Sequence, residues 1–451
     1  MDTPTQLSKL GLFDSRVPRY TSYPTSPQFA AEVGPADMER WISTIPQGSE
    51  ISLYVHVPFC RRLCWFCACR TQGTSNLATV EAYLATLKTE ISMLKKHLAP
   101  GVRLSRLHWG GGTPTLLSPD MMRDLADCLF EVAPLAENGE FSVEIDPNEI
   151  DTDRMDALVA AGMTRASVGV QDFDPEIQAT IGRIQPYDIT RRVIEQLRDR
   201  GITSLNADIL YGLPHQTSEK IADSVLRLLS LSPDRVALYG YAHVPWMARR
   251  QAMIPSDALP TPQERLKLFT VAQELFDWDG YEAIGIDHFA RPDDGLATAQ
   301  RAGQLRRNFQ GYTDDTADVL VGLGASSISR FPQGFAQNAG STGQYTKAIR
   351  AGEFASARGH IFKGDDLLRA RMIEALMCDF KIDASEMAQR FGLSAAGFAA
   401  LCRPVKDQFG AYVTLTDKGL AIPEKGRPLT RMIARAFDAY EMAVTGHSSA
   451  V

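Results

Sequence analysis

The sequence predicts an α/β protein built on a partly closed parallel (β/α) barrel, with an N-terminal arm and a small, mainly helical, winged-helix-like C-terminal domain. From Ile51 onward, short apolar runs alternate with amphipathic stretches, which is typical of buried parallel strands joined by helices. Polar residues fall at one end of the apolar runs, and parallel barrels build their active sites at the carboxyl ends of the strands. Beyond about residue 364 the pattern becomes helical.

The apolar runs and the stretches between them give the predicted elements of the barrel. Strands are expected at 51–57, 106–109, 141–145, 165–170, 204–210 and 236–241. Helices are expected at 80–97, 120–131, 151–161, 188–200 and 217–231. Repeated strand and helix units of this kind imply a parallel sheet.

Changes in composition give the predicted domain boundaries. Residues 1–48 are an arm rich in Pro, Ser and Thr, 49–352 are the barrel with its C-terminal extension, 353–364 are a linker, and 365–451 are a cap domain. The arm is equally well interpreted as a disordered terminus or as a segment that docks on the barrel. In the cap domain, 411–416 and 420–422 are expected to form a hairpin, with a last helix from Pro428.

Composition and charge exclude several classes of function. The 451 residues carry a net charge of -7, and the cap domain has as many basic as acidic residues, so nucleic-acid binding is disfavoured. The seven cysteines are an odd number without a secreted disulfide framework, which favours a reducing cytoplasm. No stretch approaches the length of a membrane span, and no signal peptide is apparent.

Three cysteines form the most informative motif of the chain. Cys60, Cys64 and Cys67 follow the first predicted strand with the spacing Cys-x-x-x-Cys-x-x-Cys, which supplies three thiolates from one loop. Three thiolates can hold a 4Fe-4S cluster and leave one iron open to a small ligand. Zinc is disfavoured because no second Cys or His pair follows. Cys69 is interpreted as a fourth ligand, a free thiol or half of a redox pair.

Further polar residues follow the other predicted strands. A Gly-Gly-Gly-Thr-Pro run begins at Gly110, and it lacks the Gly-Lys-Ser/Thr of a phosphate loop. We expect its glycines either to form a plain turn or to expose backbone to a ligand that chelates the open iron. Four more polar residues carry the groups needed to hold ribose hydroxyls, a carboxylate and a cationic ligand. These residues are Glu144, Gln171, Arg183 and Asp208.

The motifs together resemble radical S-adenosylmethionine enzymes, and in particular the oxygen-independent coproporphyrinogen III oxidase family. The resemblance rests on the cysteine run and on segments that extend from the arm to beyond the barrel core. These segments are 19–25 (Arg-Tyr-Thr-Ser-Tyr-Pro-Thr), 54–60, 107–115, 142–147, 169–173, 208–214, 241–245, 287–294 and 307–313.

The resemblance implies cofactors and their ligands. A 4Fe-4S cluster would be held by Cys60, Cys64 and Cys67, and Cys69 matches a family cysteine that is not a ligand. Two S-adenosylmethionine molecules are implied. The first would contact Tyr54, Gly111, Glu144 and Ile328, and the second Phe66, Gly112, Thr113, Gln171, Arg183, Asp208 and Ala242.

The resemblance also implies the reaction, in which a 5'-deoxyadenosyl radical removes a hydrogen from a propionate side chain. Two oxidative decarboxylations would convert coproporphyrinogen III to protoporphyrinogen IX for heme biosynthesis, with electrons from a donor such as flavodoxin or ferredoxin. The cofactors carry this chemistry, so no catalytic side chain is assigned. A monomer is expected. Phe309 and Gln310 are candidates for lining the substrate side, and Arg19, Arg249, Arg250, Arg306 and Arg307 are candidates for pairing with the four carboxylates.

Three alternatives remain open at this stage. A heme-binding chaperone of the same superfamily would share the barrel and the cluster without decarboxylation, although such relatives typically lack the arm motif and Cys69, both present here. A heme-degrading radical methyltransferase would use the same cofactors. A structural zinc protein is the third alternative.

Overall fold

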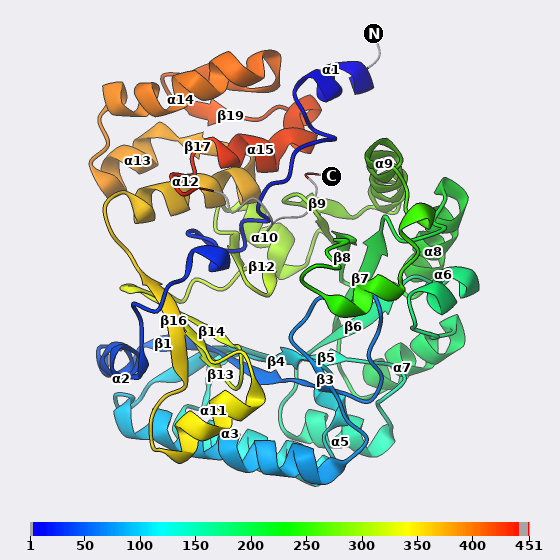
Figure 1. The fold of residues 1–451 in the computed structure, drawn as a ribbon, viewed down its shortest axis with the longest axis vertical. Coiled ribbons are helices and arrows are strands. Elements are labelled where there is room, and N and C mark those ends of the chain that lie inside the picture. Colours follow the sequence, from blue (N-terminus) through cyan, green and yellow to red (C-terminus); the bar gives the residue numbers. More distant parts are fainter. Residues whose placement is uncertain (1–2, 442–449, 451) are drawn as a thin grey trace.

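The computed structural model describes residues 3–441 and Ala450, and its core is an open parallel barrel with a separate C-terminal domain above it (Figure 1). One sheet of 12 strands runs through the barrel in the order β16-β15-β14-β13-β1-β4-β5-β6-β7-β8-β10-β9. Its two end strands, β16 and β9, do not pair, so the barrel stays open. The predicted partial parallel barrel is confirmed.

Seven neighbouring strands in the middle of this sheet are parallel, and the remaining strands extend it at both ends in antiparallel fashion. The parallel strands are β13 (Leu320–Leu323), β1 (Glu50–Val57), β4 (Arg103–Gly111), β5 (Leu135–Ile145), β6 (Arg165–Gln171), β7 (Ser204–Tyr211) and β8 (Arg235–Gly240). The antiparallel strands are β14 (Ile328–Phe331), β15 (Gly334–Asn338), β16 (Ser356–Ile361), β10 (His288–Ala290) and β9 (Glu282–Ile284).

Helices cover the outer face of the parallel strands. They are α3 (Leu77–His97), α4 (Pro119–Val132), α5 (Thr152–Ala160), α6 (Pro175–Thr180), α7 (Tyr187–Asp199) and α8 (Ser218–Ser230), with α9 (Pro262–Trp278) on α8 and α11 (Thr342–Arg350) on α3. Several begin at a side chain that caps the first turn, as when Ser118 accepts a hydrogen bond from the Met121 amide and Asp151 accepts one from the Arg154 amide. These capping side chains explain why the helices begin at these residues.

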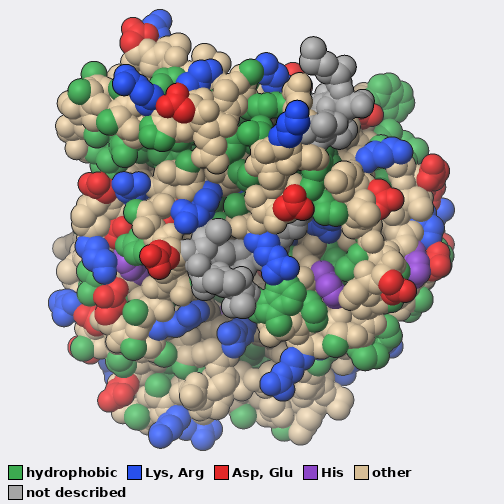
Figure 2. Space-filling view, turned by 45° about the horizontal axis from the view of Figure 1, so that its top comes forward, with side chains coloured by type: hydrophobic (Ala, Val, Ile, Leu, Met, Phe, Trp, Pro, Cys, Tyr) green, Lys and Arg blue, Asp and Glu red, His purple; other side chains and the backbone are tan. Residues whose placement is uncertain are grey.

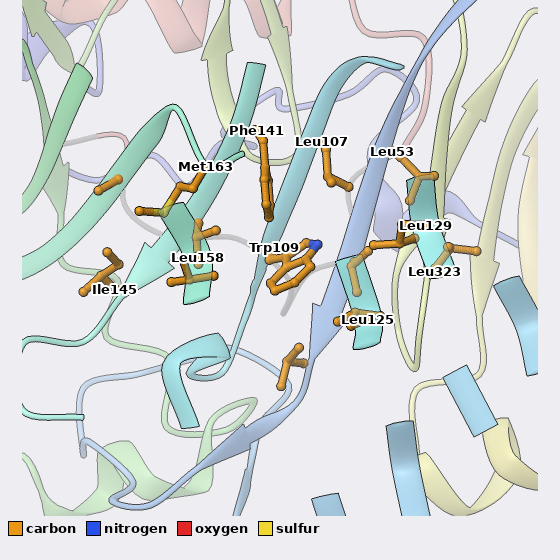
Figure 3. Packing of buried hydrophobic residues seen from close by; sticks show 14 of the residues in the cluster. Leu53, Leu107, Trp109, Leu125, Leu129, Phe141, Ile145, Leu158, Met163 and Leu323 are labelled. Atoms are coloured by element: carbon orange, nitrogen blue, oxygen red, sulfur yellow. The ribbon is translucent and has the colours of Figure 1, made fainter. Parts of the chain in front are cut away.

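The parallel strands alternate between two environments, because successive side chains of a strand point to opposite faces. Leu53, Leu107, Trp109 and Phe141 point outward and pack against α4 and α5, as Figure 3 shows. Their neighbours in the chain point into the barrel and are mostly polar. The inward residues include Ser52, Tyr54, Arg106, His108, Ser142, Glu144, Ser167, Asn206 and Asp208.

The C-terminal domain has the predicted order of helices and hairpin. It contains α12 (Asp366–Asp379), α13 (Ala384–Phe391), α14 (Ala395–Phe409), the hairpin β18 (Thr414–Thr416) and β19 (Gly419–Ala421), and α15 (Thr430–Arg435). One strand was not predicted: β17 (Lys381–Asp383) pairs with β19 and completes a three-stranded sheet.

The arm docks on this domain and on the sheet. It contains α1 (Thr3–Lys9) and α2 (Pro35–Ser43), and Figure 1 shows α1 beside the C-terminal domain and α2 at the opposite end of the molecule. Leu12, Tyr20 and Tyr23 are buried in the same apolar cluster as residues of α12, α14 and α15. The Ala439 amide donates a hydrogen bond of 3.0 Å to the Tyr23 hydroxyl. Of the two interpretations of the arm, docking is therefore confirmed.

The linker predicted at 353–364 needs a correction. Most of it is β16, which pairs along its length with β15 and forms an edge of the large sheet. Its Gly359 amide also donates a hydrogen bond to the Ala30 carbonyl of the arm. The strand escaped prediction because small residues and glycine hide its alternation, whereas β15 and the arm supply its partners.

A buried carboxyl group holds the strands beyond β13 against α3. Glu90 of α3 is fully buried and accepts hydrogen bonds from the Gly324 amide (2.7 Å), the Asn338 amide group (2.8 Å) and the Tyr345 hydroxyl (2.8 Å). Burial raises the pKa of Glu90 to about 7, despite these three donors.

Among residues 3–441, none of the helices combines the length and the apolar character that a membrane span requires.

The raised pKa predicts how stability responds to pH. Because folded Glu90 keeps a proton that the unfolded chain releases near its ordinary pKa of about 4.5, it should lower the free energy of unfolding as pH rises from about 4.5 to 7, by up to about 3 kcal/mol. Urea unfolding of Glu90→Gln, followed by circular dichroism across this range, should show a smaller fall than the parent. The exposed Glu81→Gln on the same helix is the control, and an unchanged slope in Glu90→Gln would contradict the assignment.

Candidate active site

The inward-facing side chains enclose a cavity of about 220 Å³ inside the barrel, here called the barrel cavity. Ion pairs close the end of the barrel where the strands begin, with Arg106 to Asp314 at 2.9 Å, Arg165 to Glu140 at 2.6 Å and Arg235 to Asp294 at 2.6 Å. The predicted site residues lie toward the other end, where the strands finish. These ion pairs therefore exclude bulk water from the end of the cavity where the strands begin.

A second cavity of about 440 Å³, here called the outer cleft, lies between the arm, the barrel and the C-terminal domain. It shares the lining residues Asn308, Thr313, Asp315 and Leu320 with the barrel cavity. The two spaces therefore adjoin, and a ligand in the outer cleft lies next to the interior of the barrel.

The cysteine loop follows β1 and is bounded by two short paired strands, β2 (Phe59–Cys60) and β3 (Gln72–Gly73). Within it the Cys67 amide donates a hydrogen bond to the Cys64 carbonyl. Burial raises the pKa of the Cys60 thiol to about 11, and the nearness of Cys67 and Cys64 adds to the shift. The three thiols of the predicted cluster are thus gathered in one partly buried place.

Cys69 lies beside this group and interacts with one of its members. Its amide donates a 3.4 Å hydrogen bond to Cys67 Sγ, and hydrogen bonding from Cys69 lowers the pKa of Cys67 to about 6. All seven cysteines are free. Cys69 is therefore placed to stabilise a Cys67 thiolate, which supports a role other than half of a disulfide.

The loop is held in place by three polar side chains from two neighbouring segments, the turn after α6 and the short helix Arg249–Met253. Arg183 lies 3.6 Å from Cys64 Sγ and 3.3 Å from Asp146. Arg250 donates to the Cys69 carbonyl at 3.1 Å and to the Thr71 hydroxyl at 2.9 Å. Gln251 donates to the carbonyls of Phe66 (2.7 Å) and Ala242 (3.0 Å). Sequence reasoning missed Gln251, because a single glutamine in a loop carries no pattern.

Tyr54, His108 and Glu144 form a connected polar row across β1, β4 and β5. The Tyr54 ring stacks on His108 with centroids 5.7 Å apart, and His108 Nε2 lies 3.3 Å from Glu144. The Gly111 amide donates a 3.0 Å hydrogen bond to the other Glu144 oxygen. Burial alone would raise the pKa of Glu144, but His108 and the Gly111 amide lower it, so this residue is held as a carboxylate.

The glycine run is explained in large part by close packing. A Cβ at Gly112 would lie 2.5 Å from the Phe59 carbonyl oxygen, and one at Gly111, whose φ is +113°, would lie 2.5 Å from His56. The run therefore lets β4 pass close to the start of the cysteine loop. Of the two predicted roles, a turn required by packing has direct support, and the Gly111 amide is already bonded to Glu144.

Asp208, Gln171 and Arg183 converge on the backbone of Gly169. Gly169 pairs with Asp208 across β6 and β7, and its carbonyl accepts a 3.1 Å hydrogen bond from Arg183. Burial raises the pKa of Asp208 to about 7, although Asn206 donates to it at 2.9 Å. Gln171 ends β6 with a φ of +69°, an uncommon conformation for this residue type.

The structure brings together the residues predicted for each of two ligands. In the first set, Tyr54 pairs with Gly322, whose Cα faces the backbone of Ile328, while Gly111 and Glu144 are bonded to each other. In the second set, Gly112 and Thr113 bond to the chain at 57–59, Gln251 bridges Phe66 and Ala242, and Gln171, Arg183 and Asp208 surround Gly169.

The two substrate-side candidates are separated. Phe309 lines the outer cleft, where its ring lies 5.9 Å from that of Phe335, whereas Gln310 lines the barrel cavity.

Of the candidate arginines, Arg306 lines the outer cleft, Arg307 is paired with Asp287 at 3.4 Å, and Arg19 donates to the Gly240 carbonyl. Sequence reasoning missed Arg330, Arg371 and Arg390, which also line the cleft and belong to no motif.

The donor set is compatible with an iron-sulfur cluster. No three Cys, His, Asp or Glu side chains in the described part of the chain are placed to hold one metal ion. A cube binds each thiolate to a different iron, so its ligands are spread more widely than those of one ion. Three free thiols in one loop, with Arg183 beside them, suit such a group.

Comparisons with known proteins agree with this geometry. The model of the radical SAM superfamily matches residues 54–228, and that of the HemN C-terminal domain matches residues 363–429. Oxygen-independent coproporphyrinogen III oxidase of Paracoccus denitrificans is 64% identical over 451 residues, which is 100% of both chains. The enzyme of that name from Salmonella typhimurium is 39% identical over 94% of this chain and 93% of its own.

A solved structure extends the match to the fold. Coproporphyrinogen III oxidase (HemN) from Escherichia coli, described as a radical SAM enzyme, superposes with a TM-score of 0.89 at 38% identity. The match covers 95% of this chain and 100% of that one. With its cysteine loop, its barrel and its C-terminal domain all matched, this chain belongs to the oxygen-independent coproporphyrinogen III oxidases of the radical SAM superfamily.

Proposed function

We propose that this protein catalyses the oxidative decarboxylation of two propionate side chains of coproporphyrinogen III without oxygen, which gives protoporphyrinogen IX for heme biosynthesis. The observation that carries the proposal is the loop of three thiols directly after barrel strand β1, together with a barrel cavity that adjoins a larger, arginine-lined cleft. The names of the full-length relatives support the same reaction.

The cofactors would be a 4Fe-4S cluster on Cys60, Cys64 and Cys67 and two S-adenosylmethionine molecules. When bound, they would supply the radical chemistry that removes a hydrogen from a propionate, which no acid or base of the chain can do. Tyr54, Gly111, Glu144 and Ile328 would hold the first molecule. The second would contact Phe66, Gly112, Thr113, Gln171, Arg183, Asp208 and Ala242, where the arrangement around Gly169 provides one carboxyl group and one guanidinium group.

The outer cleft suits a large ring with several carboxylates. Phe309 and Phe335 offer aromatic faces, and Arg306, Arg330 and Arg390 offer positive charge. Figure 2 shows Lys and Arg side chains gathered across the middle of this face of the molecule, between the C-terminal domain and the barrel. The C-terminal domain and the arm would close over the substrate and exclude water. Gln310 would then contact the part that enters the barrel.

The setting of the reaction follows from the same proposal. The chain would act in the cytoplasm, because seven free cysteines, three of them gathered in one partly buried loop, suit a reducing compartment. It would act as a monomer and receive electrons from a low-potential donor such as flavodoxin or ferredoxin.

The proposal is tested first by product analysis without oxygen. Reconstituted protein, reductant, S-adenosylmethionine and coproporphyrinogen III should give two successive mass losses of one carboxyl group each, together with 5'-deoxyadenosine, by mass spectrometry. Formation of 5'-deoxyadenosine with an unchanged tetrapyrrole would reject the substrate, and heme would be tried next as ligand and substrate.

Loss of any one of the three thiols should remove the cluster. Cys60→Ala, Cys64→Ala and Cys67→Ala should each lack the cluster's visible absorbance and most of its bound iron after anaerobic reconstitution. Cys128→Ala is the matched control, because Cys128 lies on α4 away from the loop and should leave iron content unchanged. A full cluster in all three loop variants would refute the ligand assignment.

The raised pKa of Asp208 predicts a pH dependence of ligand binding. As pH rises from about 6 to 8, Asp208 loses its proton and should attract the cationic ligand more strongly, which tightens S-adenosylmethionine binding by about 5- to 10-fold. Equilibrium binding to Asp208→Asn should lack this component. Titration of the ligand itself affects parent and variant alike, so equal pH profiles for the two proteins would exclude Asp208 from the site.

A further inference from the structure

Three loops lie side by side on the outside of the cysteine array: residues 58–71, 181–186 and 242–254, here called the cysteine-loop face. The Trp65 amide donates a 2.9 Å hydrogen bond to the Ile181 carbonyl, which joins the first loop to the second. Gln251 and Arg250 donate to the carbonyls of Phe66 and Cys69, which joins the third loop to the first. The face is therefore one continuous surface.

The charge of this face is opposite to that of the whole chain. Its three loops contain six arginines and no aspartate or glutamate, although the chain carries a net charge of -7. Arg61 and Arg183 are paired with Glu149 and Asp146 of neighbouring segments. Arg62 and Arg249 are exposed and have no ion-pair partner among the residues that the structure describes. A localised basic surface thus sits on an acidic protein.

The same face exposes large apolar side chains. Ile184, Trp246, Met247 and Met253 are 53%, 49%, 63% and 60% exposed, and they are four of the nine large exposed apolar side chains of residues 3–441. Burial of such side chains inside a rim of charge is typical of protein interfaces. Exposed methionines also suit surfaces that must adapt to a partner.

This face is separate from the substrate side. Neither the barrel cavity nor the outer cleft is lined by Arg62, Arg249, Trp246 or Met247. The same holds for a third cavity of about 210 Å³, between α9 and the C-terminal domain. Its charges are therefore available to a molecule that approaches from solvent while substrate occupies the cleft.

We infer that the cysteine-loop face is the docking surface for an acidic, low-potential, one-electron carrier protein, an inference that rests on the proposed function. The carrier would be oxidised by one electron and the cluster on Cys60, Cys64 and Cys67 reduced by one, with no bond formed or broken. Ala68 and Cys69 of this face are exposed and follow Cys67 directly in the chain, so a docked carrier comes close to the cluster loop. Weak redox encounters use small, charge-complementary contacts of this kind.

The inference is tested by reversing charge on the face and comparing two reductants. The double variant Arg62→Glu/Arg249→Glu should be reduced by a bacterial flavodoxin in its hydroquinone form at least about tenfold more slowly, in stopped-flow measurements of cluster absorbance. Reduction by dithionite, which needs no docking, should be unchanged.

Two further measurements test the docking itself. Met247→Ser should weaken flavodoxin binding in calorimetric titrations. The rate at which flavodoxin reduces the parent protein should fall as salt rises from about 0.02 to 0.5 M.

The matched control is Arg403→Glu, which reverses an exposed arginine on α14 of the C-terminal domain and should leave both rates unchanged. Equal flavodoxin rates in the double variant and the parent would overturn the inference, and so would a parallel fall with dithionite. Because cluster reduction is followed without tetrapyrrole, a wrong substrate assignment would not affect these readouts.

Discussion

The alternation of side chains along parallel strands is the constraint on which the rest of the structure depends. Trp109 and Phe141 must point outward to pack under helices, so His108 and Ser142, each next in the chain, must point into the barrel. A shift of one residue in any strand would exchange the two faces and bury charge under the helices. The apolar core and the polar cavity are therefore two results of one register.

The sequence predicted those parts of the structure whose residue pattern lies within one short stretch of the chain. Six of the seven parallel strands and most of the helices beside them were predictable because their apolar runs and capping residues are local, and the cysteine loop was predictable because its spacing is local. The seventh parallel strand, β13, has only four residues and was not predicted. β16 was missed because small residues and a glycine hide its alternation, and β17 was missed because three residues are too few to form a pattern. The role of Arg250 was also missed, since it depends on contact with Cys69 and Thr71, about 180 residues earlier.

The arm shows the same limit in another form. Its apolar residues have no periodic pattern, but they complete the core of the C-terminal domain, and Arg431 of α15 donates to the carbonyls of Val17 and Pro18. The arm up to Tyr23 and the described C-terminal domain thus share one apolar core.

The distribution of charge argues that substrate and electrons arrive from different directions. An acidic chain repels both an anionic tetrapyrrole and an acidic carrier at long range, so each must find a local basic surface. The outer cleft provides one, with Arg306, Arg330 and Arg390, and the cysteine-loop face provides another. Since the residues that line the outer cleft differ from the exposed residues of the cysteine-loop face, a carrier can dock while substrate occupies the cleft. This arrangement lets the enzyme exclude water from the radical chemistry and still receive electrons.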